Sequence, residues 1–156
     1  MIRNLTLLIL FLIYSSQTLA DELERSRIDL EAKKKVSISN AMILSDEQSA
    51  DFWDIYSDYE RDSGKLTRES FELIREYSDG YKDNTLTEQD ASKLIDAYFV
   101  IEKQKLDLKK SYLARFSVIL PAKKVFRFYQ IDNKIDSLIR CDIAKKLPLI
   151  EPDMEF

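Results

Sequence analysis

The sequence predicts an all-α protein, folded as an extended subunit of four helices arranged like a hairpin. Three observations lead to this prediction. Only two glycines and three prolines occur in 156 residues, which leaves few positions for tight turns. Residues that favour helices, such as Leu, Lys and Glu, are abundant. Apolar residues recur at steps of three and four, the spacing that places them on one side of a helix.

Residues 1–20 have the pattern of a cleaved export signal. A short positive start at Arg3 precedes an apolar run from Leu5 to Tyr14, and small polar residues lead to Ala20. The run is shorter than the roughly 20 residues that a membrane span needs. We therefore expect cleavage near Ala20, a periplasmic location and no stable membrane span afterwards. An uncleaved membrane anchor is the alternative.

Residues 21–43 predict a helix with a thin apolar side. Charges fall on most faces, and the apolar positions are few: Leu23, Ile28, Leu30, Val36 and Ile38. Such a face is too narrow to be buried well by itself. We expect a mobile or partner-dependent N-terminal helix.

A second helix is predicted to begin at Leu44-Ser45-Asp46-Glu47-Gln48. Ser45 is a suitable N-cap, and Gln48 can return the hydrogen bond to complete a capping box. The apolar side that follows includes Phe52, Tyr56, Tyr59, Leu66, Leu73 and Tyr77. We expect Gly80 to end the helix as a left-handed C-cap.

The third helix is predicted to start at Leu86-Thr87, after a short polar loop over residues 81–85. Thr87 is its N-cap, with Asp90 three residues later. Because few residues join two long helices, they should form an antiparallel hairpin.

Pro121 is expected in the first turn of a fourth helix, where its missing N–H costs nothing. The apolar side of that helix includes Val125, Phe128, Asp132, Ile135, Ile139 and Ile143, and Leu147-Pro148 ends it. Residues 44–147 thus form the helical hairpin domain. Residues 148–156 are an acidic, loose C-terminal tail.

Composition excludes several classes of function. There is no histidine, so Ser-His-Asp or Cys-His catalysis and His-ligated zinc are not available. A single cysteine, Cys141, cannot form an internal disulfide. Beyond residue 20 the chain has 23 basic and 28 acidic residues, a net charge of −5, which argues against nucleic-acid binding. We expect a protein that is not an enzyme and has no catalytic residues, cofactor or metal.

Charge is unevenly distributed along the chain. Residues 44–81 have a net charge of −7, and residues 121–147 have a net charge of +4. Opposite signs favour contact between these helices, within one chain or between two subunits. The alternative is that both are solvated faces.

The two helix starts resemble a known motif. Leu44-Ser45-x-x-Gln48 is similar to the LTxxQ motif of the Spy/CpxP family of small periplasmic proteins, and Leu86-Thr87-x-x-Asp90 resembles its second copy. The chain is also similar to a branch of exported proteins through Phe52-Trp53-x-x-Tyr56-x-x-Tyr59, Leu120-Pro121-Ala122-Lys123, Phe128-Tyr129-Gln130 and Leu147-Pro148-Leu149.

The resemblance implies a bent four-helix subunit that pairs antiparallel into a cradle-shaped homodimer. It also implies an ATP-independent chaperone or envelope-stress adaptor that binds partially unfolded envelope proteins on a concave helical face. The alternative is a regulatory module that docks on the periplasmic domain of a sensor kinase. Metal-responsive members use His-rich ligands, which this chain lacks.

Two groups of residues are candidates for partner binding. The first is the aromatic group Phe52, Trp53, Tyr56 and Tyr59, although helix core or a dimer seam is the interpretation that we favour for it. Trp53 lies one step off the apolar side and is the member that we expect to face a partner. The second is the basic group Lys123, Lys124, Arg127 and Lys134, for which a solvated face is the alternative.

Overall fold

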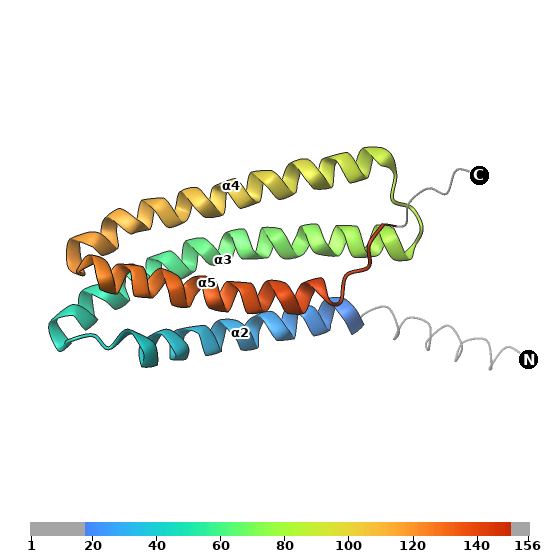
Figure 1. Cartoon of the computed structure of the whole chain (residues 1–156). Coiled ribbons are helices and arrows are strands. Elements are labelled where there is room, and N and C mark those ends of the chain that lie inside the picture. The colour runs from blue at the N-terminus through green and yellow to red at the C-terminus, as the bar shows by residue number, and fades with distance from the viewer. Residues whose placement is uncertain (1–17, 151–156) are drawn as a thin grey trace, which may run out of the picture.

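The computed structural model describes residues 18–150 and contains four long helices, which confirms the all-α prediction (Figure 1). Their bounds are α2 Thr18–Met42, α3 Asp46–Lys82, α4 Glu88–Ile119 and α5 Ala122–Ala144. Most of the predicted export signal and the end of the predicted tail, residues 1–17 and 151–156, lie outside the described residues. The last three residues of that signal, 18–20, form the first turn of α2.

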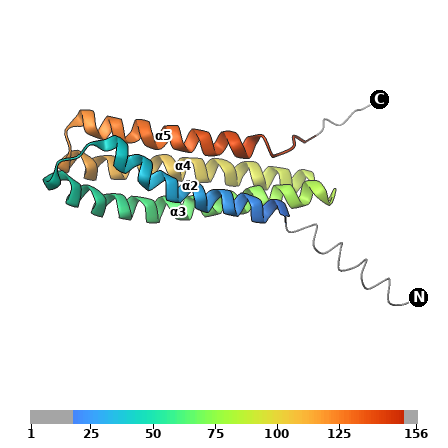
Figure 2. The same ribbon diagram turned by 90° about the horizontal axis from the view of Figure 1, so that it is seen from below.

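The helices lie side by side, and each runs antiparallel to its predecessor (Figure 1). The connections α2–α3 and α4–α5 are at one end of the molecule, which we call the closed end. The connection α3–α4 is at the other, the open end. As predicted, α3 and α4 form an antiparallel hairpin, and both extend farther toward the open end than α2 and α5 do (Figure 2).

The fully buried core occupies the half of the molecule near the closed end, and every helix contributes to it. Its members are Ile38 and Met42 of α2, Phe52, Tyr56 and Tyr59 of α3, Tyr112 and Phe116 of α4, Leu120, and Val125 and Phe128 of α5. Burying such a side chain contributes about 1.5–3 kcal/mol to folding. This half therefore supplies most of the apolar stabilisation of the described residues.

The helix α2 has its partner within the chain. Ile38 and Met42, both near its C-terminus, are buried, whereas Ile28 and Val36 of the predicted apolar side are more than half exposed. The Nε atom of Arg127 on α5 donates a hydrogen bond to the Ala41 carbonyl over 2.7 Å. Of the members of the predicted apolar side whose side chains the structure describes, Ile38 alone is buried, and it docks together with Met42 at the closed end.

The predicted capping box at Ser45 and the predicted N-cap at Thr87 are both present. The backbone N–H of Gln48 donates to the Ser45 hydroxyl, and the Ser45 N–H donates to the Gln48 side chain. Thr87 and Asp90 make the same reciprocal pair at the start of α4. These bonds satisfy backbone donors that have no partner within the helix.

The prediction for Gly80 is wrong. The helix α3 continues through Gly80 to Lys82, Asp83 is its C-cap, and the residue with a left-handed backbone is Asn84, at φ 52°. A Cβ atom on Gly80 would lie 3.2 Å from Cδ1 of Leu86, so the glycine instead allows the α3–α4 connection to fold back closely. Pro121 is the N-cap of α5, one residue before the first turn predicted for it.

Candidate functional site

The aromatic group proposed for partner binding is mostly core. Phe52, Tyr56 and Tyr59 are at most 2 % exposed, so they offer no surface to a partner in this conformation. Their rings instead contact Phe116 and Phe128 at centroid distances of 5.5–6.4 Å. The favoured interpretation, helix core, is confirmed for these three residues. The reason is that α4 and α5 cover the apolar side of α3 within the same chain.

Trp53 is the exception, as expected from its position one step off the apolar side. It is partly buried and, with Lys35, Val36, Ser39 and Asn40 of α2, lines an open, shallow hollow of about 440 Å³. The Lys35 ammonium lies 5.7 Å from the centroid of the indole ring, within range of a cation–π interaction. The hollow is too open to enclose a small ligand.

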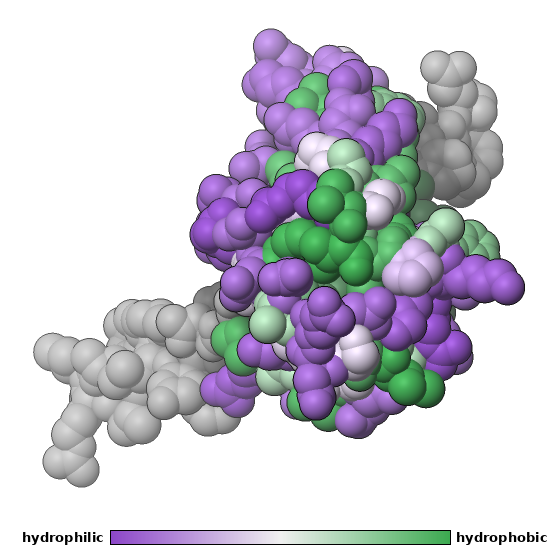
Figure 3. Space-filling view, turned by 90° about the vertical axis from the view of Figure 1, so that its left-hand side faces the viewer, coloured by the Kyte–Doolittle hydropathy of each residue, from purple (hydrophilic) through white to green (hydrophobic). Residues whose placement is uncertain are grey.

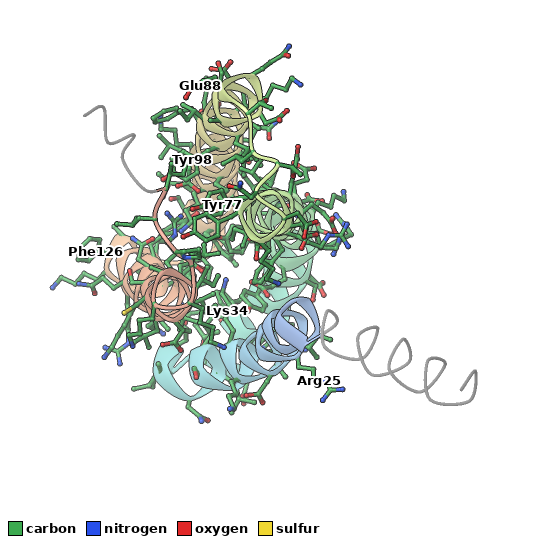
Figure 4. All side chains as sticks on the ribbon, turned by 90° about the vertical axis from the view of Figure 1, so that its right-hand side faces the viewer. Arg25, Lys34, Tyr77, Glu88, Tyr98 and Phe126 are labelled. Carbon is green, nitrogen blue, oxygen red and sulfur yellow. The ribbon has the colours of Figure 1, made fainter. Side chains whose placement is uncertain are left out.

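The predicted basic group divides in two. Lys124 and Arg127 bind the chain itself: Lys124 Nζ donates to Gln48 Oε1 over 2.6 Å and to the Ile43 carbonyl over 3.1 Å, and Arg127 donates to the Ala41 carbonyl. Lys123 and Lys134 are exposed and form no hydrogen bond or ion pair with the described residues. Phe126, beside them on α5, points away from the bundle (Figure 4).

The motif residues have structural roles that the structure makes plain. Ser45, Gln48, Thr87 and Asp90 form the capping boxes. Leu44 packs against the core, and Leu86 against Gly80. The hydrogen bonds from Thr87 hold the pKa of Asp90 below its usual value, so its carboxylate stays ionised beside the helix N-terminus. Each copy of the motif thus caps the N-terminus of a helix and packs a leucine beside it.

A buried charge cluster lies where all four helices meet, and sequence reasoning missed it. Asp132 of α5 has no solvent exposure. Its Oδ1 atom lies 2.8 Å from Nζ of Lys34 on α2, and its Oδ2 atom lies 2.9 Å from Nζ of Lys109 on α4. The Tyr59 hydroxyl of α3 donates to Oδ2 over 3.0 Å. One carboxylate therefore contacts a side chain from each of the other three helices.

Lys34 is almost as deeply placed as Asp132. It is 6 % exposed, and Figure 4 shows it reaching from α2 toward the interior. Besides Asp132, its ammonium lies 3.1 Å from Glu60 Oε1 on α3 and 3.6 Å from Asp136 Oδ1 on α5. Lys109 is less buried, and it also contacts Asp136 Oδ2 and Asn133 Oδ1 at 2.9 Å. The cluster is a connected network rather than a single pair.

Electrostatics keeps this cluster charged. Burial by itself would lower the pKa of Lys34, but the facing carboxylates, Asp132 first, outweigh it and raise that pKa above the usual value. Burial would likewise raise the pKa of Asp132, but the ammonium groups of Lys34 and Lys109 lower it. Burial and then Asp132 raise the pKa of Tyr59, so the phenol stays a hydrogen-bond donor.

These contacts assign the cluster a structural role. Asp132 and Lys34 face only side chains of the same cluster, and neither is accessible to a substrate. The signal for it in the sequence was Asp132 itself, a charged residue at a core position of the fourth helix. Its partners, from α2 and α4, are too distant in sequence to be identified by spacing.

A line of exposed apolar side chains runs along α4. Ile95, Phe99, Leu106 and Leu113 are 45–65 % exposed. At 100° per residue these positions fall within about 40° of one another, and they span about 27 Å of helix. We call these four residues the α4 row. Sequence reasoning did not identify this exposed apolar side of α4.

Charged side chains border the α4 row on both sides. Lys103 pairs with Asp107 on one side, and Glu102 accepts a bond from Arg140 of α5 on the other. An apolar centre with a polar rim is typical of a protein-binding surface.

Comparisons with known proteins add no assignment. No family model matches the chain. No curated protein and no solved structure matches it either. The resemblance to the Spy/CpxP family thus stays a prediction. Within residues 18–150, no group of three His, Cys, Asp or Glu side chains is placed to hold a metal ion, and no helix is long and apolar enough to cross a membrane.

Proposed function

We propose that this chain is an exported, non-enzymatic binding protein that holds partially unfolded envelope proteins without nucleotide. The observation that carries the proposal is the α4 row, a line of exposed apolar side chains on a helix that packs against the bundle through another side. Exposed apolar surface of this kind marks an interaction site. This location replaces the buried aromatic group as the proposed binding surface.

The form of the row favours extended, unfolded segments as partners. Its four residues lie along a line of about 27 Å, long enough for about eight residues of extended chain. They protrude instead of lining a deep pocket, so contact depends on apolar area more than on a particular side chain. The mixed charges beside the row suit polar groups of many sequences.

A light-scattering assay tests this function. The protein should suppress aggregation of heat-unfolded citrate synthase at equimolar or higher ratios. The double variant Phe99→Ser/Leu106→Ser removes two side chains from the row and should bind the client about tenfold more weakly, given the area lost. The matched control is Val100→Ser/Leu138→Ser, which removes two equally exposed apolar side chains outside the row.

Two results would reject the proposal. The first is that the native chain does not suppress aggregation of the client, and the second is that both double variants lose this suppression equally. A third result supports the alternative function. If the row binds one periplasmic sensor-kinase domain in a saturable one-to-one complex, while unfolded clients do not compete, the chain is a regulatory module.

We also propose the cradle-shaped homodimer that the resemblance implies. Light scattering coupled to size-exclusion chromatography measures the mass directly. If a second copy covers the α4 row, Phe99→Ser/Leu106→Ser should convert a dimer to a monomer, and the row is then a dimer interface instead of a client-binding surface.

A further inference from the structure

The short connection between α2 and α3, residues 43–45, has a strained backbone. Ile43, its first residue, has a φ of 48°. A β-branched residue in the left-handed region is an outlier, because its Cβ atom crowds the following carbonyl. Asn84 in the α3–α4 connection has a similar φ of 52°, but asparagine tolerates this conformation. The strain at Ile43 makes the folded arrangement less favourable by a factor on the order of ten.

The side chain of Ile43 does not compensate for this strain, because it is 75 % exposed. Val118 of α4 and Phe126 of α5, at the same end of the molecule, are 86 % and 66 % exposed. We call these three residues the closed-end patch. Figure 3 looks onto the closed end and shows a continuous hydrophobic area surrounded by hydrophilic residues. Such an area marks a contact with another molecule.

The helix α2 docks on the bundle through one line of side chains and packs chiefly against α5. Among its described side chains the buried ones are Lys34, Ile38 and Met42, at steps of four. Lys34 pairs with Asp132 of α5, and Arg127 of α5 donates to the carbonyl of Ala41. None of these contacts requires that both helices belong to the same chain.

An exchange of α2 between two copies keeps these contacts and releases the strain. In the exchanged pair, α2 of one copy docks in the core of the other, while its own α3 stays in place. Residues 43–45 then run from one closed end to the other, and three extended residues span about 10 Å. The two closed ends must therefore touch, and the closed-end patch of each copy is buried against that of the other.

The charges of the closed end permit contact with a second copy of the same surface. Residues 43–51 contain three acidic residues, and residues 118–127 contain three basic ones. They are Asp46, Glu47 and Asp51 against Lys123, Lys124 and Arg127. Arg115 is already paired with Asp58 of α3. A surface with balanced charges meets its own copy without net repulsion and does not favour a strongly charged partner.

We propose that two copies of this chain exchange α2 through a hinge at residues 43–45 and dock closed end to closed end. The partner's Lys34 then completes the buried cluster around Asp132. Such an exchange is a low-cost route to a dimer because the contacts of the monomer are reused, and a short, strained hinge favours it. The α4 row lies outside the hinge and the closed-end patch, so the proposed function does not depend on this exchange.

The strain at the hinge sets the expected affinity. Without strain, the Kd of an exchanged dimer equals the effective concentration of α2 for its own chain, on the order of 1 mM for a short connection. Relief by about tenfold at each of the two hinges lowers this Kd about a hundredfold, to about 10 μM. Glycine accepts the left-handed conformation, so Ile43→Gly should weaken the dimer about a hundredfold. The matched control Ile43→Val keeps the β-branch and should leave the Kd unchanged.

Sedimentation velocity of the full chain, over concentrations on both sides of this Kd, measures the dimer. Val118→Ser removes an exposed apolar side chain from the closed-end patch and should weaken the dimer about tenfold. Val100→Ser, the same change at an exposed valine of α4 outside the patch, should have no effect. All variants retain the apolar residues 5–14, so association through that run does not distinguish them.

Isotope-filtered NMR distinguishes exchange of α2 from pairing of intact monomers. A perdeuterated chain with protonated Ile and Met methyl groups is unfolded in urea and refolded together with unlabelled chain. Ile38 and Met42 belong to the same buried core as Phe128. In the exchanged dimer, NOEs should connect the methyl groups of Ile38 and Met42 to aromatic protons, which only the unlabelled copy supplies.

Four results would overturn the proposal. The chain stays monomeric far above the expected Kd, or it forms a dimer without these NOEs. The variants Ile43→Gly and Ile43→Val have the same Kd. Finally, Phe99→Ser/Leu106→Ser abolishes the dimer, which would place the second copy on the α4 row. None of these measurements uses a client, so a failure of the exchange and a failure of client binding are seen separately.

Discussion

Replacing Asp132 by Asn tests whether the buried charge cluster holds the bundle together. The substitution keeps the shape of the side chain and leaves an acceptor for the Tyr59 hydroxyl, but it removes the charge that faces Lys34. The Lys34 ammonium would then stay almost fully buried, with only Glu60 and Asp136 nearby. Lys109, a quarter exposed, can turn to water and keep its contacts with Asp136 and Asn133.

The expected cost follows from these differences. Removing one partner of a buried ion pair typically destabilises a protein by 3–5 kcal/mol, and we assign about 3 kcal/mol here because Glu60 still faces Lys34. The contact with Lys109 adds little, since that lysine is solvent-accessible. The loss is a large share of the 5–15 kcal/mol by which domains of this size are stable.

Urea unfolding, followed by far-ultraviolet circular dichroism, measures this cost. The matched control is Asp136→Asn, a less buried carboxylate of the same cluster, which should lose about 1 kcal/mol or less. Lys34→Met/Asp132→Asn should be more stable than the sum of the single changes predicts, because the two charges are coupled. If Asp132→Asn unfolds at the same urea concentration as the native chain, or if Asp136→Asn costs as much, the cluster does not act as described.

Four further outcomes are expected. The pKa of Asp132 is lowered in the folded state, so its stabilising effect is complete above the pKa of the unfolded chain, near 3.8, and is lost as the pH falls through the lower pKa of the folded chain. Between pH 5 and 3, the urea midpoint of Asp132→Asn should therefore change less than that of the native chain. Ser45→Ala and Thr87→Ala should each cost about 1 kcal/mol, against little for Ser57→Ala, a serine outside the caps. Tyr112→Phe should raise the pKa of Asp62 from about 2 toward 3.8, as carboxyl NMR titration would show, since the Tyr112 hydroxyl is the main group that lowers it. Tyr77→Phe removes the bond to the Pro148 carbonyl and should speed hydrogen exchange in residues 146–150 with little change in global stability.

Local hydrogen bonding made the helix starts predictable from the sequence. The end of α3, in contrast, depends on a tertiary contact. The capping boxes at Ser45 and Thr87 involve residues three positions apart, so sequence alone identifies both partners. Gly80 and Asn84 can each end a helix, and the choice between them depends on Leu86 packing against the glycine. Such a contact has no signature in helical periodicity.

The candidate binding surfaces show the same limit. Aromatic residues on α3 have the composition of either a core or an interface, and only the positions of α4 and α5 decide that Phe52, Tyr56 and Tyr59 are core. The α4 row could not be recognised in the sequence for a different reason. Its residues lie about 100° around the helix from the core positions Ile101, Tyr112 and Phe116. In sequence the two sets interleave and together look like one broad apolar side.

The two halves of the molecule have different packing, and this difference bears on how it would bind a partner. Near the closed end, interlocked aromatic rings and the Asp132 cluster fix four helices in one arrangement. Toward the open end, the apolar residues of α3 and α4 are mostly only partly buried; Ile101 is the exception. Local unfolding is easiest where few apolar contacts are made.

A partner on the α4 row thus contacts a helix that is firmly held at its C-terminal half and free to adjust at its N-terminal half. Phe99 and Ile95 lie on the adjustable part, and Leu113 lies on the fixed part. Binding that begins at Leu113 and extends toward Ile95 would let the row adapt to segments of different shape without unfolding the core.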